Sequence, residues 1–255
     1  MFLLILVILE FILIYLLSRG IFSLLFTLFY LPLKHLPAIG SCRRQVQAGQ
    51  TISNHLVSFL FLPGTVIHEF SHAIVAKLLG AEIGEINVYP HRDKETGEFK
   101  AGSIEIEEVD PVRLSLIGIA PSLVGLAILS FTIFYLFKYN LPLDNIISAT
   151  NILFQTQNYP LFLVIFIISM TMFTSKKDLR EFFLVVPFIA LVVGLLYYVG
   201  FRISLSENLI NFLKRPLTSL AFVLGITLIV DLLIYIFLFV PVSLLLSLFG
   251  KKLRK

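Results

Sequence analysis

The stretch GTVIHEFSHAIVAKLLG (residues 64–80) closes an apolar segment that starts at residue 55. This segment is long enough for a membrane helix, which needs about 20 predominantly apolar residues. His68, Glu69 and His72 interrupt it with groups that prefer water or a metal ion. Because an ionisable side chain inside a membrane helix costs at least a few kcal/mol, something must offset that cost, and a bound metal would do so.

His68 and His72 are four residues apart, so on a helix they lie on the same face and can offer two imidazoles to one ion. Zinc accepts imidazole nitrogen readily and keeps a position for water in catalytic centres. Glu69 follows the first histidine, where it can take a proton from that water without binding the metal. This is the H-E-x-x-H pattern of metalloproteases. The alternative is a polar cluster that only holds helices together.

Two histidines leave a zinc ion one protein ligand short. The extended pattern H-E-x-x-H-x-x-G-x-x-H is absent, because Val75 and Leu78 stand where its glycine and third histidine would be. Asp178 and Asp231 are the main carboxylates near or within later apolar runs, and both are geometrically possible. Asp178 fits the predicted topology better, since it follows a span on the same side as the end of the histidine helix.

The composition excludes a soluble fold. Of the 255 residues, 58% are hydrophobic and 14% are charged, against about 45–50% and about 25% in soluble domains. The single cysteine, Cys42, excludes an internal disulfide and a cysteine-rich metal site. The net charge of +4 comes largely from basic residues beside apolar runs, which indicates membrane topology and contact with the lipid bilayer, and no nucleic-acid partner.

The apolar runs predict an all-α polytopic membrane protein of about six transmembrane helices, forming a single integral membrane domain over residues 1–255. The runs are residues 1–17, 21–33, 55–79, 111–137, 160–173, 182–200 and 216–249. Residues 34–54 and 138–159 are predicted to be loops, and residues 201–215 an interfacial helix. Pro63 and Gly64 predict a kink in the histidine helix, and Gly80 predicts its end.

Residues 81–110 alternate apolar and polar side chains on either side of HRDKETGEF, which predicts a small β-hairpin after the metal-binding helix. Strand edges are not tolerated in lipid, so the hairpin must lie in water or against protein. The basic segments SKKDLRE and KKLRK predict cytoplasmic span ends and place the hairpin on the cytoplasmic side. The hairpin either adds a strand to an extended substrate or serves as a connector.

Three segments together resemble the site-2-protease-like intramembrane zinc metallopeptidases: HEFSHAIVAKLLGAEIGEI, GIAPSLVG and SMTMFTSKKDLRE. The resemblance covers a metalloprotease-like core of about residues 55–182. It implies that His68 and His72 bind Zn²⁺, that Glu69 is the general base and that Asp178 is the third ligand. The chain departs from the family in the third segment, where Thr171 and Thr174 stand nearest to the family's Asn and Pro.

The sequence and the resemblance together predict a zinc-dependent intramembrane endopeptidase, multi-pass in the cell membrane, that hydrolyses peptide bonds of membrane-spanning protein or peptide substrates. Two other classes stay open: a membrane transporter or metal-handling protein, since intramembrane ionisable groups also mark ion pathways, and a non-catalytic pseudoprotease that binds membrane partners. The sequence does not identify the substrate or the oligomeric state.

Overall fold

The computed structural model describes residues 2–34, 42–92, 99–137, 152, 155–172, 191–192, 195, 198–200 and 207–248. It is mostly helical, with one small β-hairpin. Three helical segments are long and apolar enough to cross a membrane: Ile5–Leu33, Pro111–Leu136 and Pro216–Leu248. They are compatible with an integral membrane protein and confirm the predicted helical membrane class. A bent helix pair would bring the number of spans among the described residues to four, against the six predicted.

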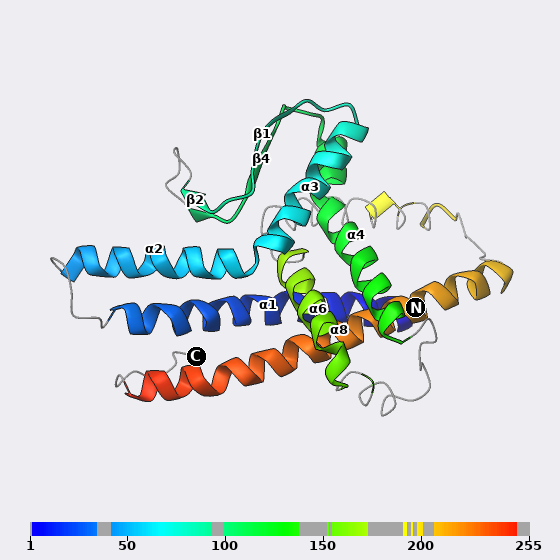
Figure 1. Cartoon of the computed structure of the whole chain (residues 1–255). Helices are drawn as coiled ribbons and strands as arrows, with labels where there is room; N and C mark the ends of the chain where they lie inside the picture. Colours follow the sequence, from blue (N-terminus) through cyan, green and yellow to red (C-terminus); the bar gives the residue numbers. More distant parts are fainter. Residues whose placement is uncertain are drawn as a thin grey trace.

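Helices α1 (Phe2–Lys34) and α8 (Glu207–Leu248) lie side by side and run in the same direction (Figure 1). A Cβ atom at Gly225 of α8 would lie 3.4 Å from Glu10 Oε1. Ten residues further along both helices, a Cβ atom at Gly20 would lie 2.9 Å from the ring of Tyr235. Both contacts join residues with the same difference in residue number, so the two helices are parallel.

Helix α1 is continuous, whereas the sequence predicted two runs separated around residues 18–20. The polar side chains there are satisfied within the helix: Ser18 Oγ donates to the Tyr15 carbonyl at 2.9 Å, and the Arg19 guanidinium lies 5.8 Å from the centre of the Tyr15 ring. Helix α8 is likewise continuous from Glu207 through Pro216, so the predicted interfacial helix is not separate. Proline is tolerated inside apolar helices whose neighbours satisfy the freed groups.

The predicted loop at residues 34–54 is wrong for its described part, because helix α2 spans Cys42–Leu60. Gly49, Ser53 and Val57 recur every four residues and are buried, so they form one helical face. A Cβ atom at Gly49 would lie 3.6 Å from the Tyr30 ring of α1. Polar residues make up much of the rest of the α2 sequence, so the sequence pattern did not indicate this narrow face of small residues.

Helix α3 (Leu62–Leu78) follows α2 after a bend of 73°. The bend falls at Phe61, just before the predicted Pro63–Gly64 kink, and Pro63 lies in the first turn of the new helix, where proline is tolerated. Gly80 ends α3 with a φ of 75°, and the N–H groups of Gly80 and Ala81 donate to the carbonyls of Lys77 and Ala76. This is a Schellman motif, which confirms the predicted helix end.

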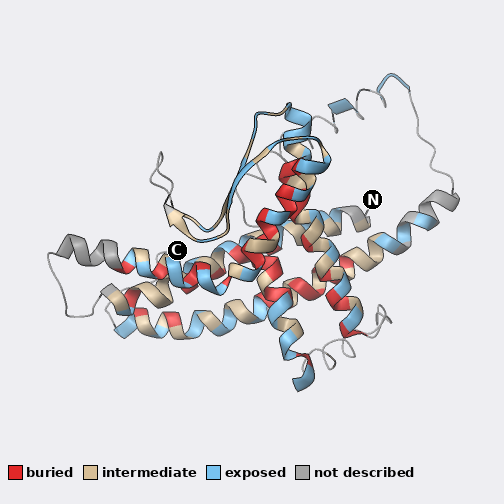
Figure 2. Cartoon of the chain, turned by 45° about the horizontal axis from the view of Figure 1, so that its top comes forward, coloured by how far each residue is buried: buried red, intermediate tan, exposed pale blue. Residues whose placement is uncertain are grey.

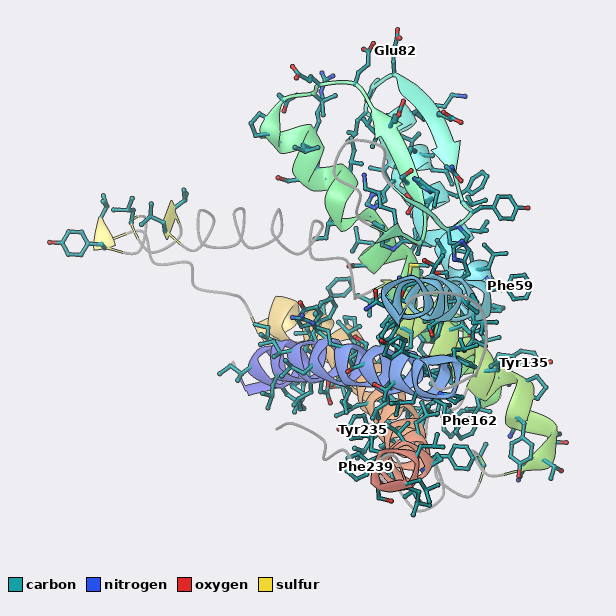
Figure 3. The ribbon with its side chains drawn as sticks, turned by 90° about the vertical axis from the view of Figure 1, so that its left-hand side faces the viewer. Phe59, Glu82, Tyr135, Phe162, Tyr235 and Phe239 are labelled. Carbon is teal, nitrogen blue, oxygen red and sulfur yellow. The ribbon has the colours of Figure 1, made fainter. Side chains whose placement is uncertain are left out.

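The predicted hairpin is confirmed. Strand β1 (Ile83–Asn87) pairs antiparallel with β4 (Ser103–Ile106), and β2 (His91–Arg92) pairs with β3 (Phe99–Lys100). Figure 3 shows Glu82, at the start of the hairpin, at the opposite end of the molecule from Tyr235 and Phe239 of α8.

Helix α4 (Pro111–Leu136) begins at Asp110, whose Oδ1 accepts from the N–H groups of Val112 and Arg113. A short 3₁₀ turn, η1 (Thr156–Asn158), leads into α6 (Tyr159–Met172), a shorter apolar helix. Buried residues concentrate where α3, α4 and α6 meet the α1–α8 pair (Figure 2). The predicted span at residues 182–200 lies mostly outside the described residues.

Candidate metal centre

Helix α3 reverses the usual distribution of side chains. Its exposed side carries large apolar residues, Phe70, Ile74 and Leu78. Its other side is buried and largely polar or small: Gly64, Thr65, His68, Glu69, Ser71, His72, Ala73 and Ala76. A helix with apolar groups outside and ionisable groups inside is suited to lipid on one side and a polar site on the other.

The two predicted zinc-binding histidines lie next to each other on this buried side. The ring centroids of His68 and His72 are 4.9 Å apart, and the ring planes are 80° apart. This confirms that both imidazoles share one face of α3, as the four-residue spacing predicts.

Helix α4 fixes the orientation of His72. Nδ1 of His72 lies 2.8 Å from the carbonyl oxygen of Ile117. A carbonyl can only accept, so Nδ1 carries the proton and donates, and Nε2 of the neutral ring bears the lone pair. A histidine whose one ring nitrogen donates to a carbonyl, leaving the other as an acceptor, has the arrangement of metal-binding imidazoles in proteins.

The hairpin covers the predicted general base. Glu69 is buried, and Gly102, immediately before β4, lies against it: a Cβ atom at residue 102 would be 2.9 Å from Glu69 Oε1 and 2.9 Å from Thr65 Cγ2. The φ angle of Gly102 is not in the left-handed region, so the glycine matters here for space: a Cβ atom would require the Glu69 or Thr65 side chain to shift. The hairpin backbone therefore forms one wall around the Glu69 carboxylate.

The C-terminal end of α6 packs against two glycines. A Cβ atom at Gly64 of α3 would collide with the side chain of Thr171, and one at Gly125 of α4 would lie 2.5 Å from Met172 Cβ. Ser122 of α4 also donates to the Met172 carbonyl at 3.3 Å. The end of α6 is thus held between α3 and α4, one helical turn from His68.

The structure describes only one of the two aspartates predicted as a third zinc ligand. Asp178, together with Thr174, lies outside the described residues. Asp231 is fully buried in α8 and accepts a hydrogen bond of 2.8 Å from Ser169 Oγ of α6. In the part of the chain that the structure describes, no three His, Cys, Asp or Glu side chains gather as a metal-binding group, so Asp231 does not join the two histidines.

The chemistry of these donors fits zinc. Two imidazoles on one helix face, one of them held by a carbonyl, would supply two of the ligands of a catalytic zinc site, and a buried carboxylate lies beside them. Sequence reasoning missed the Ile117 carbonyl and Gly102. Pro121 in GIAPSLVG carried a signal for the first, whereas a lone glycine in a hairpin carried none for the second.

No protein-family model, curated protein or solved structure matches the chain.

Proposed function

We propose that the chain is a zinc-dependent endopeptidase that hydrolyses peptide bonds of membrane-spanning proteins or peptides within the bilayer, in the manner of the site-2-protease-like metallopeptidases that it resembles. One observation carries the proposal: His72 is oriented by the Ile117 carbonyl beside His68 and a buried Glu69, on the inward face of an apolar helix. The two imidazoles and the carboxylate stand in the order of the H-E-x-x-H pattern of metalloproteases, and a backbone carbonyl of a second helix holds one of the rings.

His68 and His72 would hold the zinc ion through ring nitrogens. Bound zinc would activate a water molecule and polarise the substrate carbonyl. Glu69 accepts the proton of the attacking water on a carboxylate oxygen and passes it to the leaving amine. The hairpin at Gly102 and the helices around α3 restrict bulk water, which strengthens electrostatic interactions at the reacting atoms.

Asp178 is the proposed third ligand. Asp178 is the sixth residue after Met172, and an extended chain of six residues reaches at most about 20 Å. Because Thr171 and Met172 are seated on Gly64 and Gly125, the chain leaves α6 beside the histidine helix. Asp231 is instead engaged by Ser169.

The proposed enzyme is a multi-pass protein of the cell membrane with about six spans and a cytoplasmic hairpin. Its substrate is a membrane helix that unwinds locally at the site. The hairpin edge offers hydrogen-bonding groups to such an extended segment. Apolar side chains on the exposed side of α3, such as Ile74 and Leu78, suit contact with lipid.

The decisive experiment uses detergent-purified chain and the variant Glu69→Gln, which keeps the size of the side chain and removes its basicity. Both proteins should hold about one zinc per chain. Cleavage of a membrane-spanning peptide should fall by about a hundredfold to ten-thousandfold in the variant, and a chelator should abolish wild-type cleavage. Full cleavage by Glu69→Gln would contradict the mechanism.

The rival proposals are a transporter or metal-handling protein and a non-catalytic pseudoprotease. Asp231 and Glu10 favour the first, because they are carboxyl groups within apolar helices away from the histidines. Zinc transport into proteoliposomes without cleavage would support the transporter. Zinc binding with neither cleavage nor transport would support the pseudoprotease.

A further inference from the structure

Pro121 lies inside α4, one turn beyond the residue whose carbonyl accepts from His72. In a regular helix the N–H of residue 121 would donate to the carbonyl of Ile117. Proline has no N–H, and its ring clashes with the carbonyl four residues earlier, so that carbonyl loses its helical donor. The Ile117 carbonyl is therefore available to another element, and His72 Nδ1 reaches it at 2.8 Å.

We propose that Pro121 is a positioning residue for the metal centre. By removing one helical donor, it reserves the Ile117 carbonyl for His72 and fixes the imidazole with its proton on Nδ1 and its lone pair on Nε2. The inference rests on the proposed metal-binding role of His72. A ligand histidine held in this way keeps one tautomer and one orientation and is a more basic ligand.

The surroundings of this hydrogen bond support the assignment. Ile117, Pro121 and His72 are all buried, so water has little access to replace either partner. The two prolines inside α8, Pro216 and Pro241, have a different setting. The residues four positions before them, Phe212 and Phe237, lie on the exposed side of α8, whereas Ile117 faces the histidine helix.

Pro121→Ala tests the proposal because alanine restores the N–H and is the best helix former. The melting temperature should change little, since the helix gains a hydrogen bond while the buried His72 Nδ1 loses its acceptor. Zinc affinity should nevertheless fall by about 10- to 100-fold, the usual cost of losing an outer-shell partner of a ligand histidine. Pro241→Ala is the matched control and should keep wild-type zinc affinity.

A second measurement needs neither a variant nor zinc. Nitrogen-15 NMR of the zinc-free wild type should show the His72 ring protonated on Nδ1 only, and Pro121→Ala should lose this single form. A proton on Nε2 in the wild type, or unchanged zinc affinity in Pro121→Ala, would overturn the role of Pro121 alone. A wild type that binds no zinc would instead overturn the proposed function, even where the Nδ1 signal is seen.

Discussion

Among the residues that the structure describes, buried ionisable side chains lie between apolar helices in two places, and the two places differ in what surrounds them. On α3, His72 donates to α4, His68 lies beside it, and Glu69 lies under the hairpin. In α8, Asp231 accepts one hydrogen bond from Ser169 of α6. The other Asp231 oxygen, Oδ2, has no hydrogen-bond partner among the described residues.

The difference shows that burial of an ionisable group does not by itself identify a reactive site. Elements α3, α4 and the hairpin converge on the first place and orient several functional atoms about one region. The second place is a single contact between two helices, of the kind that joins membrane helices by polar groups. Both places interrupt an apolar run in the sequence, the first with His68, Glu69 and His72 and the second with Asp231 alone.

The largest expected contrast concerns zinc. His72→Ala removes a proposed ligand and should weaken zinc binding by more than the roughly 10- to 100-fold cost of losing an outer-shell partner. Asp231→Ala should leave the zinc content unchanged, because Asp231 does not gather with the histidines. Elemental analysis of the two purified variants checks this. Zinc lost from Asp231→Ala and kept by His72→Ala would reverse the assignment of the two places.

A smaller effect is expected where the hairpin meets the site. Gly102→Ala puts a methyl group 2.9 Å from Glu69 Oε1 and should lower kcat for a membrane peptide by about a hundredfold, as misplacement of a reacting group by about 1 Å can do. Zinc should stay bound. Gly84→Ala, in the same hairpin but against Glu105, is the control and should cleave normally. Equal activity of both variants would show that the hairpin does not position Glu69.

The smallest effect concerns the helix contact in α8. Asp231→Ala removes one of the two acceptors of the Ser169 hydroxyl, the other being the Phe166 carbonyl at 2.9 Å, and should lower the free energy of unfolding by about 1 kcal/mol. Asp231→Asn keeps an oxygen acceptor and should lose less. Unfolding in mixed detergent, with zinc-saturated chain, measures both. A loss of cleavage in Asp231→Asn at unchanged stability would give Asp231 a functional role and remove the contrast.

The helical membrane class, the hairpin, the end of α3 at Gly80 and the shared face of His68 and His72 were predictable, because each depends on local spacing or on one turn residue. The path of α1 through residues 18–20 was not, because Ser18 and Arg19 are satisfied by Tyr15 one turn away. Two adjacent polar residues therefore did not indicate a break in the helix.

Helix α2 and the walls of the site were missed for a different reason. The signal for α2 was a face of small residues rather than an apolar stripe. The contacts of Ile117 with His72 and of Gly102 with Glu69 join residues that are distant in the sequence. A missing Cβ has no distinctive sequence pattern. Pro121 indicates a carbonyl without its helical donor but not the side chain that binds it, so only the assembled structure reveals the two contacts.

The parallel register of α1 and α8 restricts how the chain is threaded through a bilayer. Two helices that cross in the same direction, with Glu10 against Gly225 and Gly20 against Tyr235, begin on the same side. Where both helices cross the bilayer, Phe2 and Leu248 therefore face opposite compartments.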